Sequence, residues 1–152
     1  MFAVIRIKGR VETRKKIEDT LQMLRLKHIN NCVLVPETED YRGMLSKAKD
    51  FITWGEINKE TLVKMLEKRL RAEGDKRVDK KVLKEATGFD SFEKFADELI
   101  ASKIKIKNFE KIKPVFRLTP PSKGFKSVKD AYPKGDLGYR KEEINELIER
   151  MI

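Results

Sequence analysis

The alternation of apolar and polar residues predicts three short strands in the first part of the chain. Apolar side chains gather in three runs that are each short enough for one strand, at residues 2–8, 30–35 and 51–54. Between them, Ile17, Leu21 and Leu24 recur at helical spacing after Thr13, a possible cap, and a shorter helix starts near Tyr41. The order is β-α-β-α-β. A right-handed crossover predicts that the first two strands are parallel, and the third strand is expected to pair antiparallel with the first.

After Asn58 the apolar pattern changes to the spacing of helices. Asn58 is a suitable cap for a helix whose apolar positions are 62, 63, 66 and 70. A shorter helix is expected between Asp79 and Gly88, because glycine commonly ends a helix. Asp90 and Glu93 have the spacing of a capping box in front of a third helix. These helices are expected to form an inserted lobe.

The last third of the chain combines extended, irregular and helical patterns. Alternating Ile and Lys at 103–107 predict an extended edge, and residues 114–118 predict another short strand. Proline and glycine interrupt residues 119–138 too often for a packed element, so a long basic loop is expected there. A helix from about Arg140 has an apolar stripe that should dock on the body, formed by Ile144, Leu147, Ile148 and Met151.

These elements predict an α+β protein with a ferredoxin-like β-α-β-α-β core and a three-stranded mixed sheet. The core is assigned to residues 1–57, with its helices on one face of the sheet. Residues 58–152 form an extension that comprises helices (58–102), a basic strand and loop (103–139) and a C-terminal helix (140–152). Because 152 residues are enough for one sizeable hydrophobic core, both parts are expected to pack as one compact unit.

The distribution of charge points to a polyanionic partner. The chain has 35 Lys and Arg against 25 Asp and Glu, a net charge of +10. Residues 1–16 carry six basic groups and one acid, and residues 103–134 carry ten and two. The remaining residues therefore hold 19 basic and 22 acidic groups, a net charge of −3. Positive charge gathered in two blocks is what a nucleic-acid surface requires, whereas solubility alone does not require it.

Several classes of protein do not fit the sequence. Cys32 is the only cysteine and lies in an apolar run, which excludes an internal disulfide and a thiolate metal site. No apolar run approaches the length of a membrane span, and the chain begins directly with a strand pattern, so a cytoplasmic protein is expected. His28 has no evident nucleophilic partner. We expect no catalytic residue, no metal, no cofactor, no membrane contact and no small-molecule substrate.

Two segments have the chemistry to bind RNA. Arg42 and Gly43 are expected in the first turn of the second helix, where unpaired N–H groups attract anions, although most helix starts bind nothing. Residues 123–126 (Lys-Gly-Phe-Lys) combine cations with a glycine that permits close approach to a backbone. Phe125 either stacks on an unpaired base or fills a gap in the core. Trp54, in a strand, is expected in the core.

Four segments together resemble the ribosomal protein L-thirty family of the large subunit, in its long archaeal and eukaryotic-type form. They are Phe2 to Gly9, the Tyr41-Arg42-Gly43-Met44 helix running into Phe51 to Gly55, the loop from Phe116 to Phe125, and Lys134 to Arg140. Residues 1–57 look like the minimal core of the short bacterial members. The resemblance implies a non-catalytic, structural constituent of the large ribosomal subunit. It also implies binding to large-subunit rRNA, and other large-subunit proteins as partners.

The resemblance and the charge distribution together give a set of candidate RNA-binding residues. They are Arg10, Arg14, Lys15, Arg42, Gly43, Lys47, Arg117, Lys123, Gly124, Phe125, Lys126 and Lys134. Their expected role is to neutralise phosphates and fix the register on an RNA that is recognised by shape. One alternative is an assembly factor that binds RNA transiently. The other is a small ferredoxin-like enzyme such as a phosphatase, which would need a defined pocket.

Overall fold

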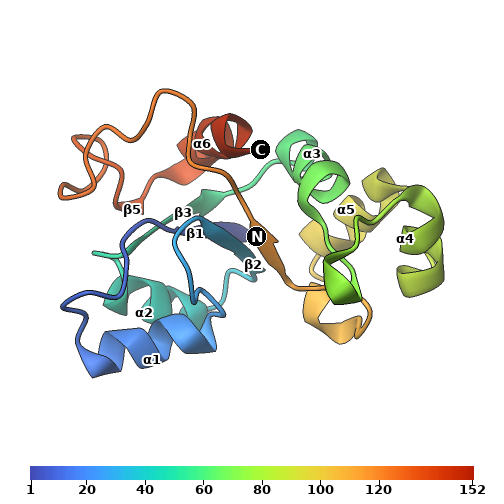
Figure 1. Ribbon diagram of the computed structural model, residues 1–152, viewed down its shortest axis with the longest axis horizontal. Coiled ribbons are helices and arrows are strands. Elements are labelled where there is room, and N and C mark those ends of the chain that lie inside the picture. Colours follow the sequence, from blue (N-terminus) through green and yellow to red (C-terminus); the bar gives the residue numbers. More distant parts are fainter.

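The computed structural model describes residues 1–152 and contains a mixed five-stranded sheet in the order β4-β2-β1-β3-β5 (Figure 1). Its strands are β1 (Phe2–Arg6), β2 (Asn31–Val35), β3 (Ile52–Glu56), β4 (Val115–Arg117) and β5 (Gly138–Tyr139). β1 is antiparallel to β2 and β3, β4 is antiparallel to β2, and β5 is parallel to β3. The α+β class with a mixed sheet is confirmed. The expected three strands are wrong, because the extension adds one strand at each edge.

The predicted parallel pairing of the first two strands is wrong, because the chain re-enters the sheet at the end where it left. After α1 (Lys15–Met23), the Asn30 N–H donates to the Arg6 carbonyl at 2.8 Å. The Arg6 guanidinium donates to the Leu26 carbonyl at 2.7 Å. Both bonds hold the end of the crossover against the end of β1, so β2 must run back along it. The antiparallel pairing of β1 with β3 is confirmed.

One face of the sheet is covered by α1 and α2 (Glu39–Lys47) (Figure 1). The alternate residues Phe2 and Val4 of β1 point to this face and join a cluster of 11 buried residues with Leu21 of α1 and Leu45 of α2. Trp54 is only 9% exposed and belongs to the same cluster. The expectation that Trp54 completes the core is therefore confirmed.

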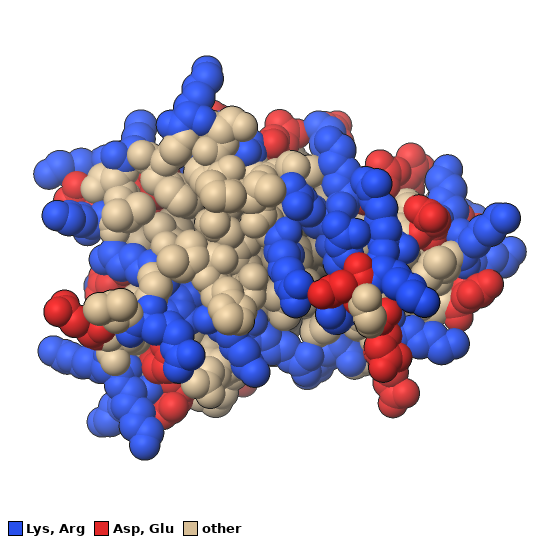
Figure 2. Space-filling view, in the orientation of Figure 1, with Lys and Arg blue, Asp and Glu red and all other residues tan.

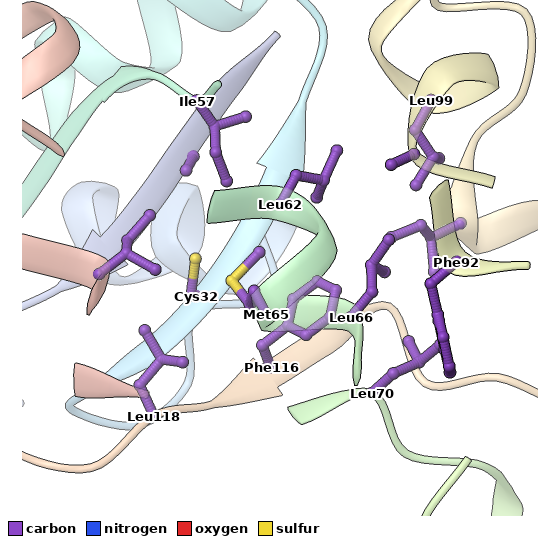
Figure 3. Close-up of a cluster of buried hydrophobic side chains, with 14 of the residues drawn as sticks. Cys32, Ile57, Leu62, Met65, Leu66, Leu70, Phe92, Leu99, Phe116 and Leu118 are labelled. Atoms are coloured by element: carbon purple, nitrogen blue, oxygen red, sulfur yellow. The ribbon is translucent and has the colours of Figure 1, made fainter. Parts of the chain in front are cut away.

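The opposite face carries a larger cluster of 23 buried residues, shown in part in Figure 3. Ala3, Ile5 and Cys32 enter it from the sheet, and α3 (Lys59–Arg69) and α6 (Ile144–Met151) pack over them. The apolar stripe of α6 is buried, as predicted from its spacing. Cys32 is fully buried in this cluster, which confirms its expected role as a small buried hydrophobe, and the burial raises the pKa of its thiol to about 12.

The lobe consists of α4 (Lys80–Thr87) and α5 (Phe92–Ile100), which lie beyond α3 on the right of Figure 1. Phe92, Phe95 and Leu99 of α5 belong to the same cluster as the sheet residues Ala3 and Ile5. One apolar core thus extends from the sheet through α3 into the lobe. Residues 1–57 and the extension share that core.

Helix ends were predicted with mixed success. Asn58 caps α3 as expected, since its side chain accepts a hydrogen bond from the Thr61 N–H at 2.8 Å. Gly88 adopts a left-handed conformation (φ 81°) and ends α4. The capping box at Asp90 is wrong, because the Ser91 hydroxyl accepts the bond from the Lys94 N–H at 3.3 Å. α1 begins after Arg14, and Thr13 makes no cap bond.

The extended edge expected at 103–107 is also wrong. The segment is irregular and enters a 3-10 turn (Ile106–Asn108), in which the Asn108 N–H donates to the Lys105 carbonyl at 3.0 Å. Ile106 is buried in the larger cluster and Ile104 packs against it, so the isoleucines bend the segment into the core. The strand expected at 114–118 is confirmed as β4.

Candidate nucleic-acid interface

The sheet topology brings the two positively charged blocks to one end of the sheet. In the registers, Ile5 lies opposite Cys32 and Thr53, and Thr53 lies opposite Gly138. The chain therefore leaves β1 and enters β2, β3 and β5 at the same end, where β4 also finishes. Residues 7–14 and 118–137 start from this end, and both loops lie at the left of Figure 1. We call these two loops the basic end.

The first loop of the basic end and the start of α1 present three candidate cations. Arg10, Arg14 and Lys15 are all exposed. The Nε of Arg10 lies 3.1 Å from a carboxylate oxygen of Glu18, whereas Arg14 and Lys15 form no ion pair. Two of the three charges are therefore free to meet phosphates.

Arg6 belongs to the same block of sequence but lies inside the protein. It is fully buried, and its guanidinium contacts the carbonyl of Lys8 at 2.8 Å, that of Leu26 at 2.7 Å and a Glu18 oxygen at 3.5 Å. These contacts inside the protein satisfy the positive charge of Arg6. Arg6 therefore offers nothing to a polyanion, although the charge count had included it.

The start of α2 does not have the unpaired N–H groups that were expected at Arg42 and Gly43. The helix begins earlier, at Glu39, and the Arg42 N–H already donates to the Thr38 carbonyl at 3.0 Å. Glu39 and Asp40 also make the first turn acidic, which disfavours an anion there. The expected helix-start anion site is wrong because the helix starts three residues before Arg42.

The side chains of α2 remain available for binding. The Arg42 guanidinium is 62% exposed, 3.7 Å from Glu37 and 5.8 Å from the centre of the Phe2 ring. Gly43 is exposed, and a methyl group added there would meet no atom within 4 Å. Lys47 is exposed in the last turn and forms no ion pair. Arg42 lies away from the basic end, near the start of β1, because it packs on Phe2.

The second loop of the basic end presents cations on a folded support. Lys123, Gly124, Lys126 and Lys134 are exposed. Phe125 is half-buried and packs against the larger core cluster, so it fills the edge of the core and anchors the loop. The three lysines form no ion pair with any carboxylate.

A buried ion pair that sequence reasoning missed gives this loop its shape. The Arg140 guanidinium donates to Asp136 Oδ1 at 2.8 Å and to Thr53 Oγ1 at 2.9 Å, and both charged residues are only 4% exposed. The other oxygen of Asp136 accepts the backbone N–H groups of Lys126 and Ser127. The loop is thus fastened to the sheet. The only sign of this ion pair in the sequence is the spacing of Asp136 and Arg140, which are four residues apart.

Arg117 is exposed but lies beside a second concentration of positive charge. Its guanidinium is 3.0 Å from Asp75, which also binds Lys113. The hydrogen bond from Lys113, together with the charge of Arg117, lowers the pKa of Asp75. Backbone hydrogen bonds join the chain segments on either side of Asp75 to each other and to the segment that carries Lys113. Figure 2 shows the Lys and Arg side chains gathered there, right of centre. The members of this cluster are Arg69, Arg71, Lys76, Arg77, Lys111, Lys113 and Arg117.

An aromatic cavity lies between α2 and the edge strand β5. It has a volume of about 320 Å³ and is lined by Phe2, Arg42, Ser46, Trp54 and Tyr139. The Tyr139 ring centre lies 6.1 Å from that of Trp54 and 6.2 Å from that of Phe2. Its hydroxyl donates to Glu56, which raises the pKa of Tyr139 to about 12. Sequence reasoning missed this cavity, because it depends on strand pairing between residues 54 and 139.

No helix in the structure is both long and apolar enough to cross a bilayer. His28, the only histidine, is exposed.

Comparison with known proteins gives a consistent result. Residues 2–52 match the family model described as ribosomal protein L30p/L7e. The chain is 46% identical over 151 residues to the large ribosomal subunit protein uL30 of Archaeoglobus fulgidus, with 99% of each chain covered. It is 47% identical over 153 residues to uL30 of Methanosphaera stadtmanae, with both chains fully covered. Such identity over whole chains shows that this protein belongs to the ribosomal protein L30p/L7e family.

Proposed function

We propose that this chain is a non-catalytic, structural constituent of the large ribosomal subunit, in the cytoplasm, where it binds large-subunit rRNA through its basic end and the exposed cations of α2. Its other partners are proteins of the same subunit. The observation that carries the proposal is the topology, which delivers two positive loops, residues 7–14 and 118–137, to one end of the sheet. The relatives named as uL30 proteins of the large subunit support it.

The free cations give the proposed interface its electrostatic basis. Six candidate side chains are exposed and form no ion pair within the protein: Arg14, Lys15, Lys47, Lys123, Lys126 and Lys134. Each can neutralise a phosphate without first breaking an internal bond. The Asp136 and Arg140 pair fixes the loop that carries three of them, so less conformational entropy is lost on binding. The protein is therefore prepared to read the shape of a folded RNA.

Arg10, Arg42 and Arg117 differ from this group because each faces a carboxylate. Their partners are Glu18, Glu37 and Asp75, and the three arginine side chains are between 62% and 69% exposed. Exposed ion pairs of this kind contribute only about 0–1 kcal/mol. A phosphate can therefore replace the carboxylate at small cost. In the proposal these arginines fix register after the free lysines have provided attraction.

The salt dependence of binding tests this proposal. If about six phosphates are neutralised, the logarithm of the affinity for large-subunit rRNA falls against the logarithm of salt concentration with a slope near −4 to −5. Changing Arg42, Lys123 and Lys126 together to Ala reduces the magnitude of that slope by about 2. Filter binding at several salt concentrations measures both slopes.

A matched control removes the same charge elsewhere. Lys59, Lys64 and Lys84 each lie within 2.8 Å of a carboxylate on the helices of the extension. Changing these three to Ala also removes three positive charges, but the slope should keep its value. An unchanged slope in the first triple variant would remove its three residues from the interface. Equal flattening in both variants would show that net charge alone governs binding.

A further inference from the structure

The aromatic cavity shares Arg42 with the proposed RNA-binding surface, but phosphate binding does not account for its aromatic rings. It lies between α2 and β5, the strand at one edge of the sheet (Figure 1). Phe2 and Trp54 are nearly buried at this edge, whereas Tyr139, beside them, is 43% exposed. One aromatic ring thus remains open to solvent on a rigid base.

The open ring is held in a fixed orientation. Tyr139 pairs with Trp54 in the β3–β5 ladder, so both side chains stand on the same face of the sheet. Its hydroxyl is bound by Glu56, and its ring meets Phe2 edge-on, with an interplanar angle of 75°. A ring that is already immobilised loses little conformational entropy when a ligand stacks on it.

The chemistry around the ring fits a nucleotide. Arg42 lines the cavity from α2, with its guanidinium held over Phe2, and Ser46 adds a hydroxyl one helical turn further on. Aromatic rings and guanidinium planes are the groups on which unpaired bases stack. The cavity also joins two segments proposed to bind rRNA, the helix that carries Arg42 and Lys47 and the end of the basic loop.

We propose that the cavity between α2 and β5 receives one unpaired base of the large-subunit rRNA, which stacks on Tyr139 beside the Arg42 guanidinium. The inference rests on the proposed function and adds a contact that depends on shape and stacking. The binding energy of this contact comes from stacking on the uncharged ring of Tyr139. Loss of that ring therefore weakens binding equally at all salt concentrations, whereas loss of a lysine changes the salt slope.

The test compares Tyr139→Ala, Tyr139→Phe and the wild-type protein for binding to archaeal large-subunit rRNA transcribed in vitro. Loss of one stacked base lowers affinity about 5- to 150-fold, so this is expected for Tyr139→Ala, with the salt slope unchanged. Tyr139→Phe keeps the ring and is expected to restore most of the lost affinity. Ile100→Ala, at a side chain 36% exposed on α5, is the matched control and should bind as the wild type does.

Trp54 provides a second readout within the same protein. It is the only tryptophan, and its ring centre lies 6.1 Å from that of Tyr139. A base that enters the cavity should quench its fluorescence in the wild type and in Tyr139→Phe. The quenching should disappear in Tyr139→Ala, whose folding is checked by urea unfolding.

The outcomes separate this inference from the proposed function. If rRNA binds with the expected salt slope while Tyr139→Ala keeps wild-type affinity, or if Trp54 fluorescence does not respond, the inference is overturned and the proposed function stands. If Tyr139→Ala affects only retention in reconstituted large subunits, a protein side chain occupies the cavity, and the inference is likewise overturned. If the wild-type protein binds no rRNA, both fail.

Discussion

At the scale of single residues, the buried charges hold this protein together and the exposed ones are left for a partner. Arg6 and Arg140 are both almost inaccessible, and each donates to oxygen atoms that fasten a loop to the sheet. Arg14 and Lys123, which are also basic, make no ion pair inside the protein. The count of positive charges therefore overstates what the surface offers. Geometry is needed to separate structural arginines from binding ones.

Asp136→Ala tests the structural half of this division. The change leaves the Arg140 charge buried without a partner, which lowers the free energy of unfolding by about 3–5 kcal/mol. It also removes the acceptor for the N–H groups of Lys126 and Ser127, so hydrogen exchange in the loop accelerates. Urea unfolding and exchange measurements check the two effects.

Asp97→Ala is the control for that change. Asp97 pairs with Lys59 at 2.7 Å, but both side chains are at least half exposed. Its loss should cost no more than about 1 kcal/mol. Equal destabilisation by the two substitutions would contradict the role given to the buried pair.

At the scale of elements, close packing between β3 and the turn before α6 fixes the edge of the sheet. A methyl group at Gly55 would lie 1.9 Å from the Lys141 carbonyl oxygen, so only glycine fits there. This approach places the chain after β5 directly against β3. It therefore holds β5, and with it the end of the basic loop, in place.

Two Gly→Ala substitutions should change stability in opposite directions. Gly55→Ala forces β3 and the turn apart and destabilises the protein by about 1–3 kcal/mol or more. Gly43→Ala, on α2 in open space, stabilises it by about 0.5–1 kcal/mol, because alanine restricts the unfolded chain and favours a helix. Thermal unfolding measures both. Stabilisation by Gly55→Ala would disprove the close approach.

Strong local patterns made some elements predictable and left others hidden. The alternation of Ala3 and Ile5 with Phe2 and Val4 identified β1, and the spacing in 144–151 identified α6, because each pattern reflects burial on one face. β5 has only two residues and no pattern of its own. The direction of β2 was also hidden, because the Arg6 side chain and Asn30 fix it through contacts distant in sequence.

The features of the candidate RNA-binding surface likewise fall into those that local sequence revealed and those that it did not. The lysines of the late loop were found from local charge, and the structure shows them exposed. The expected anion site at Arg42 failed because the helix begins at Glu39, and helix ends are poorly defined by sequence. The cavity at Tyr139 and the cluster around Asp75 each join separate segments, so composition along the chain could not reveal them.

At the scale of the whole molecule, the larger of the two buried clusters joins the sheet to the extension beneath a surface with separate charged regions. The larger cluster runs from β1 through α3 to α5, and it ties the N-terminal strands to the extension. The basic end lies at one side of this body, and the cluster around Asp75 lies over the extension (Figure 2). In the proposed function, cations on two sides of one folded body let the protein contact RNA at two places.

The proposed function requires that the protein remain in the mature large subunit. An assembly factor would bind the same RNA but leave as the particle is completed. Co-sedimentation of the tagged chain with mature large subunits, before and after a high-salt wash, distinguishes the two roles directly. We expect about one copy for each large subunit both before and after the wash. Absence of the chain from mature subunits, or its complete loss in the wash, would show that it is not a structural constituent of the subunit.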